Sequence, residues 1–219
     1  MRYFDKIDRT ISPYSNFLLF CLVFCFIFLT ALFPLAWQQT VGQVFFSLIF
    51  FLSIFALDTG RSKLVVVAIV AFITQWVSIV ANMPVLFYIS SLTNILFFQI
   101  IVIKLIIQIA QSRKADASVI FEAINGYLMM GLMFTSWVAI AMLYNPASFS
   151  FYSAETTSVD YTYFTFVTMT TLGYGDVTPQ LPYALSLAVL ISTSGEIYVA
   201  VIIAMLVGKY AGSVGSDAE

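Results

Sequence analysis

The chain has 219 residues, of which 61% are hydrophobic and 9% charged, with a formal net charge of −2 and a mean hydropathy of +0.99. A soluble domain carries about 25% charged residues, so this composition excludes one and indicates an integral membrane protein. The sequence has no histidine, and it contains no nucleophile–base pair, phosphate-binding loop or metal-ligand spacing. We therefore predict a protein that is not an enzyme, with no cofactor and no nucleic-acid partner.

Residues 1–16 place apolar side chains at helical spacing among charges, which predicts a short cytoplasmic segment lying on the membrane surface. The apolar run at 17–37 is too long for a cleaved signal peptide, and we interpret it as the first membrane span. Cys21 and Cys25 share one face of that span. We expect them to pack as small apolar residues rather than to form a disulfide or a metal site.

Further apolar runs follow along the chain, and a run of about 20 residues can cross about 30 Å of hydrocarbon. Together the runs fall at about 17–37, 43–57, 64–81, 85–108, 119–144 and 183–208. Helices are expected, because an open sheet would leave backbone groups unpaired in lipid. We predict an all-α membrane protein with six transmembrane helices, the second of which is short and extends into its flanks.

The nine basic residues all lie on, or close to, one side of such a six-span arrangement. By the positive-inside rule, both termini are then cytoplasmic, in a plasma membrane or a bacterial inner membrane. The loops on the opposite side hold no Lys or Arg, but they hold Glu155, Asp160 and Asp176. Negative potential there would concentrate cations at this face.

Residues 168–176 read Thr-Met-Thr-Thr-Leu-Gly-Tyr-Gly-Asp, after an aromatic and β-branched segment and before two prolines. The two glycines permit backbone dihedrals with positive φ, so that successive carbonyl oxygens can point to one axis. A glycine-rich turn between membrane helices would require neither the threonines nor the aspartate. The central stretch resembles the selectivity filter of potassium channels, and we name it the filter motif: Thr171, Leu172, Gly173, Tyr174 and Gly175.

The resemblance implies a K⁺-selective channel in which the permeant K⁺ ions are held by oxygens of Thr171, Leu172, Gly173 and Tyr174. Leu172 stands where the family usually has Val or Ile. The filter motif occurs once and no internal repeat is evident, so four chains must supply one pore, and we expect a homotetramer in the lipid bilayer.

A charged linker at 111–118 separates the first four predicted helices (17–110) from a pore unit (119–210), and residues 211–219 remain as a cytoplasmic tail. This division resembles that of six-helix channels of the voltage-gated type. It implies a four-helix voltage-sensor-like domain followed by a two-helix pore unit with a re-entrant pore helix and filter. Thr157 or Ser158 is expected to cap the pore helix.

The fourth predicted span departs from that family. A voltage sensor needs Arg or Lys at every third residue, whereas this span offers only Lys104, near its inner end. We expect a channel with weak or no voltage dependence. Lys104 is either a residual gating charge or, as we favour, a snorkelling anchor. With only a short tail after the last span, we expect gating to act through the membrane part, the filter, intracellular ions or a separate subunit.

The pore-helix segment contains three candidate supports for the filter. Many channels of this family carry Trp where Phe164 stands, and its N–H holds the aspartate after the filter; Phe164 cannot make that bond with Asp176. Val167 supplies no carboxyl partner, whereas Tyr163 can donate a hydrogen bond. The alternative is that these side chains simply pack.

The last span contains two candidate gating residues. Gly195 lies twenty residues after Gly175, the spacing of the hinge glycine in related channels, and marks either a bend or close packing. Glu196 is the only formal charge between Tyr183 and Gly208. Facing the cavity, it would form a ring of four carboxylates open to block by intracellular Mg²⁺ or polyamines; facing the subunit wall, it would bond hydroxyl groups.

These observations predict a channel that passes K⁺ passively. A non-conducting or regulatory channel subunit is the nearest alternative. A K⁺ transporter component is a further one, although a transporter would usually show inverted repeats or several degenerate filter loops, and this sequence has neither.

Overall fold

The structure is a computed structural model that describes residues 2–57, 61–81, 83–112, 116–152 and 156–216. Helices dominate the described residues, which agrees with the predicted all-α class. The α-helices are α1 (Arg2–Leu29), α2 (Leu35–Phe55), α3 (Arg61–Ala81), α4 (Pro84–Gln111), α5 (Ala117–Tyr144), α6 (Ser158–Met169) and α7 (Pro182–Ser216). The short elements are two 3-10 turns, Thr30–Leu32 and Pro146–Ser148, and two strands, β1 (Phe149–Ser150) and β2 (Thr178–Pro179).

Four helices of the described part are long and apolar enough to cross a membrane. They contain the segments Tyr14–Leu32, Val85–Gln111, Ala117–Tyr144 and Pro182–Ala211. Shorter apolar segments lie in α2 and α3, at Thr40–Phe55 and Leu64–Ser78. Length and composition therefore support four of the six predicted spans, and the complete six-span arrangement stays a prediction.

The first predicted span, 17–37, is wrong at its C-terminal boundary. α1 ends at Leu29, the 3-10 turn follows, and Phe33 is extended with φ −80° and ψ 149° before Pro34. Proline lacks a backbone N–H and disfavours helical geometry in the residue before it, so the chain breaks here although its side chains stay apolar. The next helix starts at Leu35, so the second span does extend into its N-terminal flank as predicted.

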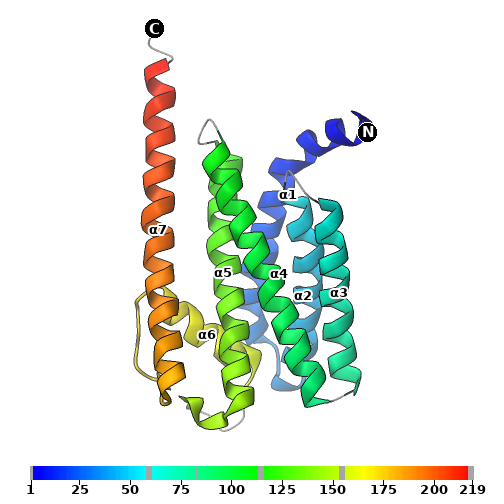
Figure 1. Ribbon diagram of the computed structural model, residues 1–219, viewed down its shortest axis with the longest axis vertical. Helices are drawn as coiled ribbons and strands as arrows, with labels where there is room; N and C mark the ends of the chain where they lie inside the picture. The colour runs from blue at the N-terminus through cyan, green and yellow to red at the C-terminus, as the bar shows by residue number, and fades with distance from the viewer. Residues whose placement is uncertain (1, 58–60, 82, 113–115, 153–155, 217–219) are drawn as a thin grey trace.

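The predicted surface segment, residues 1–16, is the beginning of α1 rather than a separate helix. Figure 1 shows this part of α1 turned away from the axis of the bundle. α1 contains Pro13, a common cause of helix kinks because it removes one backbone hydrogen bond. The side chains of residues 1–13 lie outside the described part of the structure.

The first four helices pack in sequence order, α1 on α2, α2 on α3 and α3 on α4. Phenylalanine rings fill the space between them. The Phe50 ring meets the Phe97 ring edge to face at a centroid distance of 4.9 Å, and the Phe46 ring meets the Phe98 ring at 5.8 Å. Such edge-to-face pairs stabilise a core beyond the area that they bury. The leading helices therefore form a unit with its own aromatic core.

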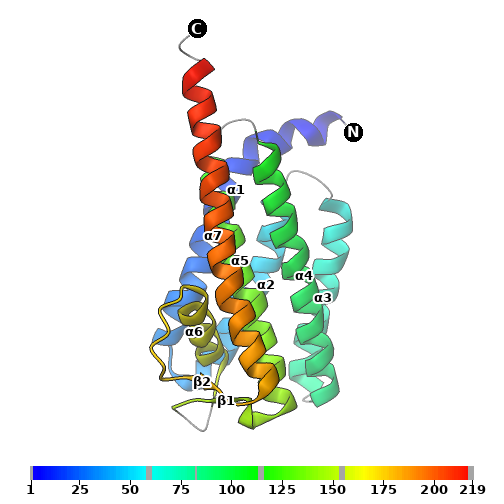
Figure 2. The same ribbon diagram turned by 60° about the vertical axis from the view of Figure 1, so that its left-hand side comes forward.

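This four-helix unit packs against the second half of the same chain. α4 and α1 both contact α5, and α4 and α5 lie side by side in Figures 1 and 2. The connection from Gln111 to Ala117 is short, so α5 must return antiparallel beside α4. Asp116 starts α5 by accepting a hydrogen bond from the backbone N–H of Val119 at 3.0 Å. Residues 113–115 of the predicted linker lie outside the described residues.

The short helix α6 packs between α5 and α7, at the end of the bundle opposite to the start of α1 and the end of α7 (Figure 2). β1 and β2 pair antiparallel there, with Phe149 opposite Pro179. The last helix, α7, is longer than predicted. It continues through Ser216 into the segment 211–219, which was expected to be a tail. The short helix α6 is thus held between two long helices.

Candidate functional site

The site begins at the N-terminus of α6, where Asp160 closes a capping box. Its carboxylate accepts hydrogen bonds from the backbone N–H of Thr157 at 2.7 Å and from the Thr157 hydroxyl at 3.0 Å. The Tyr152 hydroxyl also donates to Asp160, which raises the pKa of Tyr152. Thr157 is the cap residue, as the sequence suggested. Glu155, another acid predicted for this face, lies outside the described residues.

After α6, the chain reverses into the filter motif. The N–H of Thr171 donates to the Thr168 carbonyl at 3.0 Å, and the N–H of Gly173 donates to the Val167 carbonyl at 3.2 Å. The dihedral φ is positive at every second residue: 60° at Thr171, 52° at Gly173 and 80° at Gly175. This is the alternation expected from the glycine spacing. A positive φ at a threonine is uncommon and marks backbone that its surroundings must hold in place.

One face of the filter motif is open in the single chain. The side chains of Leu172 and Tyr174 are 55% and 67% exposed. A Cβ atom placed on Gly173 or on Gly175 would meet no described atom within 4 Å. The extended backbone between α6 and β2 therefore presents an uncovered surface.

Asp176, directly after the filter motif, is held by the α6 residue Tyr163. The Tyr163 hydroxyl donates to an Asp176 carboxylate oxygen at 2.6 Å, and this bond raises the pKa of Tyr163 to about 12. The other carboxylate oxygen accepts the N–H of Val177 at 3.1 Å. The sequence showed that Phe164 cannot bond to Asp176 and that Tyr163 can donate; the structure brings the donor and the acceptor together.

Phe164 has a packing role, which was the alternative left open for it. Its side chain is 4% exposed, and its ring meets the Phe149 ring of β1 at a centroid distance of 4.8 Å. Val167 contributes its backbone carbonyl to the turn, while its side chain lines a mainly apolar pocket with residues of α1. Val167 therefore holds the centre of the filter motif through a backbone hydrogen bond, and Phe164 packs α6 against β1.

Gly195 lies where α7 crosses the end of α6. A Cβ atom there would overlap the Met169 carbonyl oxygen and would come within 2.6 Å of the Met169 Cγ atom. α7 continues as a helix through this position. The contact with Met169 therefore supports close packing at Gly195, whereas a hinge role stays a prediction.

Glu196, the next residue, is exposed in the single chain and makes no hydrogen bond to another described residue. The Thr170 hydroxyl donates its hydrogen bond to the Phe166 carbonyl at 2.7 Å and not to Glu196. What surrounds the Glu196 side chain therefore depends on the neighbouring chains of an assembly.

Two further contacts join α5 to α6 and α7, and the sequence did not indicate either of them. The Tyr198 hydroxyl donates to the Ala123 carbonyl at 2.9 Å and passes over Gly126, where a Cβ atom would lie 3.1 Å from the Tyr198 Cζ atom. Gly131 faces the Phe166 ring, whose Cε1 atom would lie 2.7 Å from such a Cβ. Small residues on α5 thus let aromatic side chains from the two other helices approach its backbone.

A buried acid on α5 was also missed. Glu122 is 4% exposed, and it accepts a hydrogen bond from the Asn16 amide of α1 at 3.2 Å. Glu122, Asp116 and Lys104 line one cavity of about 460 Å³ at the end of the bundle away from α6. Lys104 therefore lies beside polar groups of its own chain. The signal in the sequence was a lone charge within the apolar run of α5.

The two halves of the chain also meet where α4 ends. The Lys209 ammonium group donates to the Ala110 carbonyl at 3.1 Å and to the Ser112 carbonyl. The last carbonyls of a helix lack partners and carry a partial negative charge, so a cation stabilises them. Lys209 thereby joins α7 to the leading four-helix unit.

Fold and site together define a helical protein with four helices long and apolar enough to cross a membrane, and with a short helix and an exposed backbone segment between two of them. Residues 132–211 match the family model described as "Ion channel", a range that includes the second half of α5, all of α6, the filter motif and most of α7. No curated protein and no solved structure matches the chain. The chain thus carries an ion channel domain, and α1 to α4 lie outside the matched range.

Proposed function

We propose that this chain is the subunit of a K⁺-selective channel that passes potassium passively across a cell membrane. The observation that carries the proposal is the filter motif: a Thr-Leu-Gly-Tyr-Gly sequence whose φ angle is positive at Thr171, Gly173 and Gly175, within an ion channel domain. Alternating dihedrals of this kind turn successive carbonyl groups toward one side of a strand.

Selectivity would come from the replacement of the hydration shell of K⁺ by protein oxygens. We assign this role to the carbonyls of Thr171, Leu172, Gly173 and Tyr174 and to the Thr171 hydroxyl. The hydrogen bond from Tyr163 to Asp176 holds the segment at its far end, and the bond from Gly173 to Val167 holds it against α6. These contacts support a strand that stays extended when ions enter and leave.

One strand cannot surround an ion, so we propose a closed tetramer of identical chains. The exposed face of the filter motif supports this, and so does α7, which exposes large apolar side chains such as Val189, Ile197 and Val201. In the tetramer, some of these would meet neighbouring chains and others would meet lipid. Both termini would be cytoplasmic, since α1 begins and α7 ends at the same end of the bundle in Figure 1, and the basic residues Lys104 and Lys209 lie in the C-terminal parts of α4 and α7.

The leading helices are proposed to be nearly insensitive to voltage. The α4 segment contains a single charged residue, Lys104, and this residue lies in the last two turns of the helix. A charge that crosses the whole field gains about 2.3 kcal/mol per 100 mV, and a charge near the edge crosses only a fraction of that field.

The test is a bilayer recording of the purified full-length protein under a K⁺/Na⁺ gradient. A K⁺-selective channel gives a reversal potential close to the K⁺ equilibrium value and current in discrete single-channel steps. A reversal potential near zero overturns selectivity. Transport without current steps would favour a transporter, and a tetramer that carries no current would favour a regulatory subunit.

A further inference from the structure

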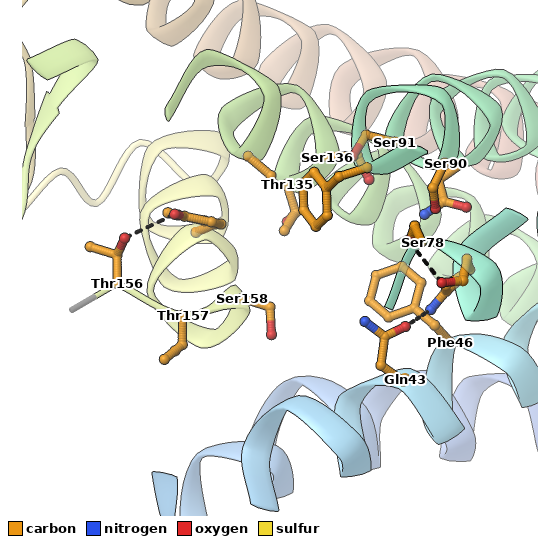
Figure 3. A pocket seen from close by; sticks show the side chains of 15 residues that line it. Gln43, Phe46, Ser78, Ser90, Ser91, Thr135, Ser136, Thr156, Thr157 and Ser158 are labelled. Atoms are coloured by element: carbon orange, nitrogen blue, oxygen red, sulfur yellow. Dashed lines mark hydrogen bonds between the residues drawn. The ribbon is translucent and has the colours of Figure 1, made fainter. Parts of the chain in front are cut away.

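A polar cavity of about 370 Å³ lies between the leading four-helix unit and the start of α6. Its lining includes Gln43 of α2, Gln75 and Ser78 of α3, Asn94 of α4, Ser136 of α5 and Thr157 before α6. Figure 3 shows Thr157 and Ser158 on one side of the cavity, and Ser78, Ser90 and Ser91 on the opposite side. The chain thus gathers polar side chains from five separate segments in one place.

The position of these groups makes the cavity unusual. Gln75, Ser78 and Ser91 are 4%, 6% and 7% exposed, on helices that are otherwise dominated by Val, Ile, Leu and Phe. A buried polar group without a hydrogen-bond partner costs free energy, and helices in an apolar environment seldom carry several of them without use. Their convergence indicates a site for a polar molecule.

The hydrogen bonds show which chemistry the site offers. The hydroxyls of Ser78, Thr135 and Ser136 donate to backbone carbonyls of their own helices, at 2.8, 2.9 and 3.2 Å. Each hydroxyl has therefore used its proton, and only its oxygen lone pairs remain for a ligand. The side-chain oxygens of Gln75 and Asn94 are buried with no hydrogen-bond partner in the described part of the chain. These groups offer acceptors to a ligand, and the amide N–H groups of Gln43 and Asn94 offer donors.

The charges around the cavity restrict the class of ligand further. Among the described residues, those that line the cavity include no Asp, Glu, Lys or Arg. The Asp160 carboxylate in the first turn of α6 offsets the partial positive charge at this helix end, so the described lining favours neither a cation nor an anion. Phe46 and Phe87 add apolar surface to the same lining. A molecule with several O–H donors, a short C–H framework and no charge matches this combination.

We propose that the cavity binds a small uncharged polyol. Its hydroxyls would donate to Gln75 and Asn94 of the four-helix unit and to the oxygens of Ser136 and Thr157. The volume equals that of about a dozen water molecules at ~30 Å³ each, which accommodates a polyol of four to six carbons at about that scale. The ligand would touch both the leading helices and the cap of α6, the helix that carries the filter motif.

The experiment measures binding directly on the full-length protein in detergent micelles, by saturation-transfer NMR with erythritol, xylitol and myo-inositol. We expect saturable binding of at least one of them, with a dissociation constant on the order of 1 mM. Asn94→Leu removes one buried acceptor and should weaken binding about tenfold. The matched control is Gln99→Leu, which removes an amide from an exposed position of the same helix and should leave binding unchanged.

Ser136→Ala provides a second variant of small packing cost, and it carries the test if Asn94→Leu does not fold. Three results overturn the proposal: no saturable binding of any of the three polyols, which would leave the cavity to water; binding that neither variant weakens; or thermal stabilisation by RbCl that Asn94→Leu removes while polyols have no effect, which would assign the cavity to a cation. None of these measurements depends on ion conduction, so the proposed channel function and the polyol site fail independently.

Discussion

The Tyr163 hydroxyl of α6 and the Asp176 carboxylate after the filter motif lie 2.6 Å apart and form a hydrogen bond across the turn that contains Thr171 to Gly175. The bond joins the helix before the motif to the residue directly after it. A hydrogen bond of this kind, from a hydroxyl to a carboxylate, belongs to the stronger class of protein hydrogen bonds. The donor stands directly before Phe164, the position for which the resemblance to potassium channels implied an indole donor.

Removal of the hydroxyl should loosen the filter motif. We predict that Tyr163→Phe keeps the tetramer assembled but makes the K⁺ current decline faster when external K⁺ is lowered, since fewer ions and one contact fewer then hold the strand. The matched control is Tyr161→Phe, which removes a hydroxyl from the same helix that bonds to Thr156 at 2.9 Å instead of to Asp176. An equal decline of the K⁺ current in both variants would show that the hydrogen bond to Asp176 does not specifically stabilise the filter motif.

The same bond predicts a pH dependence with a definite sign. The pKa of Tyr163 rises from 10.0 to about 12 in the folded protein, so the folded state holds the phenol proton more tightly than the unfolded state. The stabilisation is complete below pH 10.0 and is lost as the pH rises toward about 12. Thermal unfolding of the wild type should show this loss, and Tyr163→Phe should lack it. A wild-type profile identical to that of the variant would contradict the contact.

The glycine at the centre of the filter motif offers the sharpest test of the conduction geometry. Gly173 has a φ of 52°, which disfavours any residue with a Cβ, although open space surrounds the position. Gly173→Ala should therefore abolish the K⁺ current because alanine disfavours this backbone conformation, and not because its methyl group clashes with a neighbour. Size-exclusion chromatography should still show the tetramer. Gly208→Ala is the control, since Gly208 is exposed on α7 with no described atom near its added Cβ; current that persists in Gly173→Ala would contradict the filter assignment.

Much of this arrangement could be predicted from the sequence, because spans and filter motif depend on local pattern. Apolar runs located the long helices, and glycine spacing predicted the positive φ values at Gly173 and Gly175. The end of the first span was misplaced because hydropathy alone does not register the break at Pro34. Local rules therefore worked where one segment determines its own conformation.

Contacts between distant segments could not be predicted in this way. The bond from Asn16 to Glu122 joins residues 106 positions apart, and the polar cavity combines Gln43, Asn94 and Ser136 from three helices. Each of these residues alone looks like an isolated polar position in an apolar helix. Only the packing of α1 to α5 shows which of them face one another.

A substitution of Gly195 distinguishes a hinge at this position from a close packing contact. A Cβ there would overlap the Met169 carbonyl, and overpacking of this kind costs about 1–3 kcal/mol. Gly195→Ala should thus lower the melting temperature of the tetramer, whereas Gly208→Ala should leave it unchanged or raise it, since Ala favours a helix by about 1 kcal/mol. An unchanged melting temperature combined with an altered open probability would instead support the hinge.

Voltage dependence tests the role of Lys104. With one charge near the edge of the field, the open probability should change little with voltage once ion block is removed. Lys104→Gln should leave the conductance–voltage curve equally shallow, and its main effect should fall on stability, because Lys104 lines the cavity that also contains Glu122. A steep wild-type curve that becomes shallow in this variant would make Lys104 a gating charge.

Glu196 on α7 is the residue at which we expect intracellular cations to block the pore. It is exposed in the single chain and follows Gly195, whose contact with Met169 brings this part of α7 against the end of α6 just before the filter motif. We predict that in the tetramer four such carboxylates face the water-filled cavity and attract multivalent cations, which depolarisation drives into the pore. Internal Mg²⁺ or spermine should then block outward current and produce inward rectification without a voltage sensor.

Recording Glu196→Gln and Glu196→Asp with and without these cations decides the position of the side chain. Glu196→Gln removes the charge and should weaken the block by about tenfold or more, since a change of about 1.4 kcal/mol in binding free energy alters affinity tenfold. Glu196→Asp keeps the charge and should retain most of the block, which excludes a merely structural effect. If block and conductance are unchanged in Glu196→Gln while the tetramer remains assembled, Glu196 faces the subunit wall and takes no part in permeation.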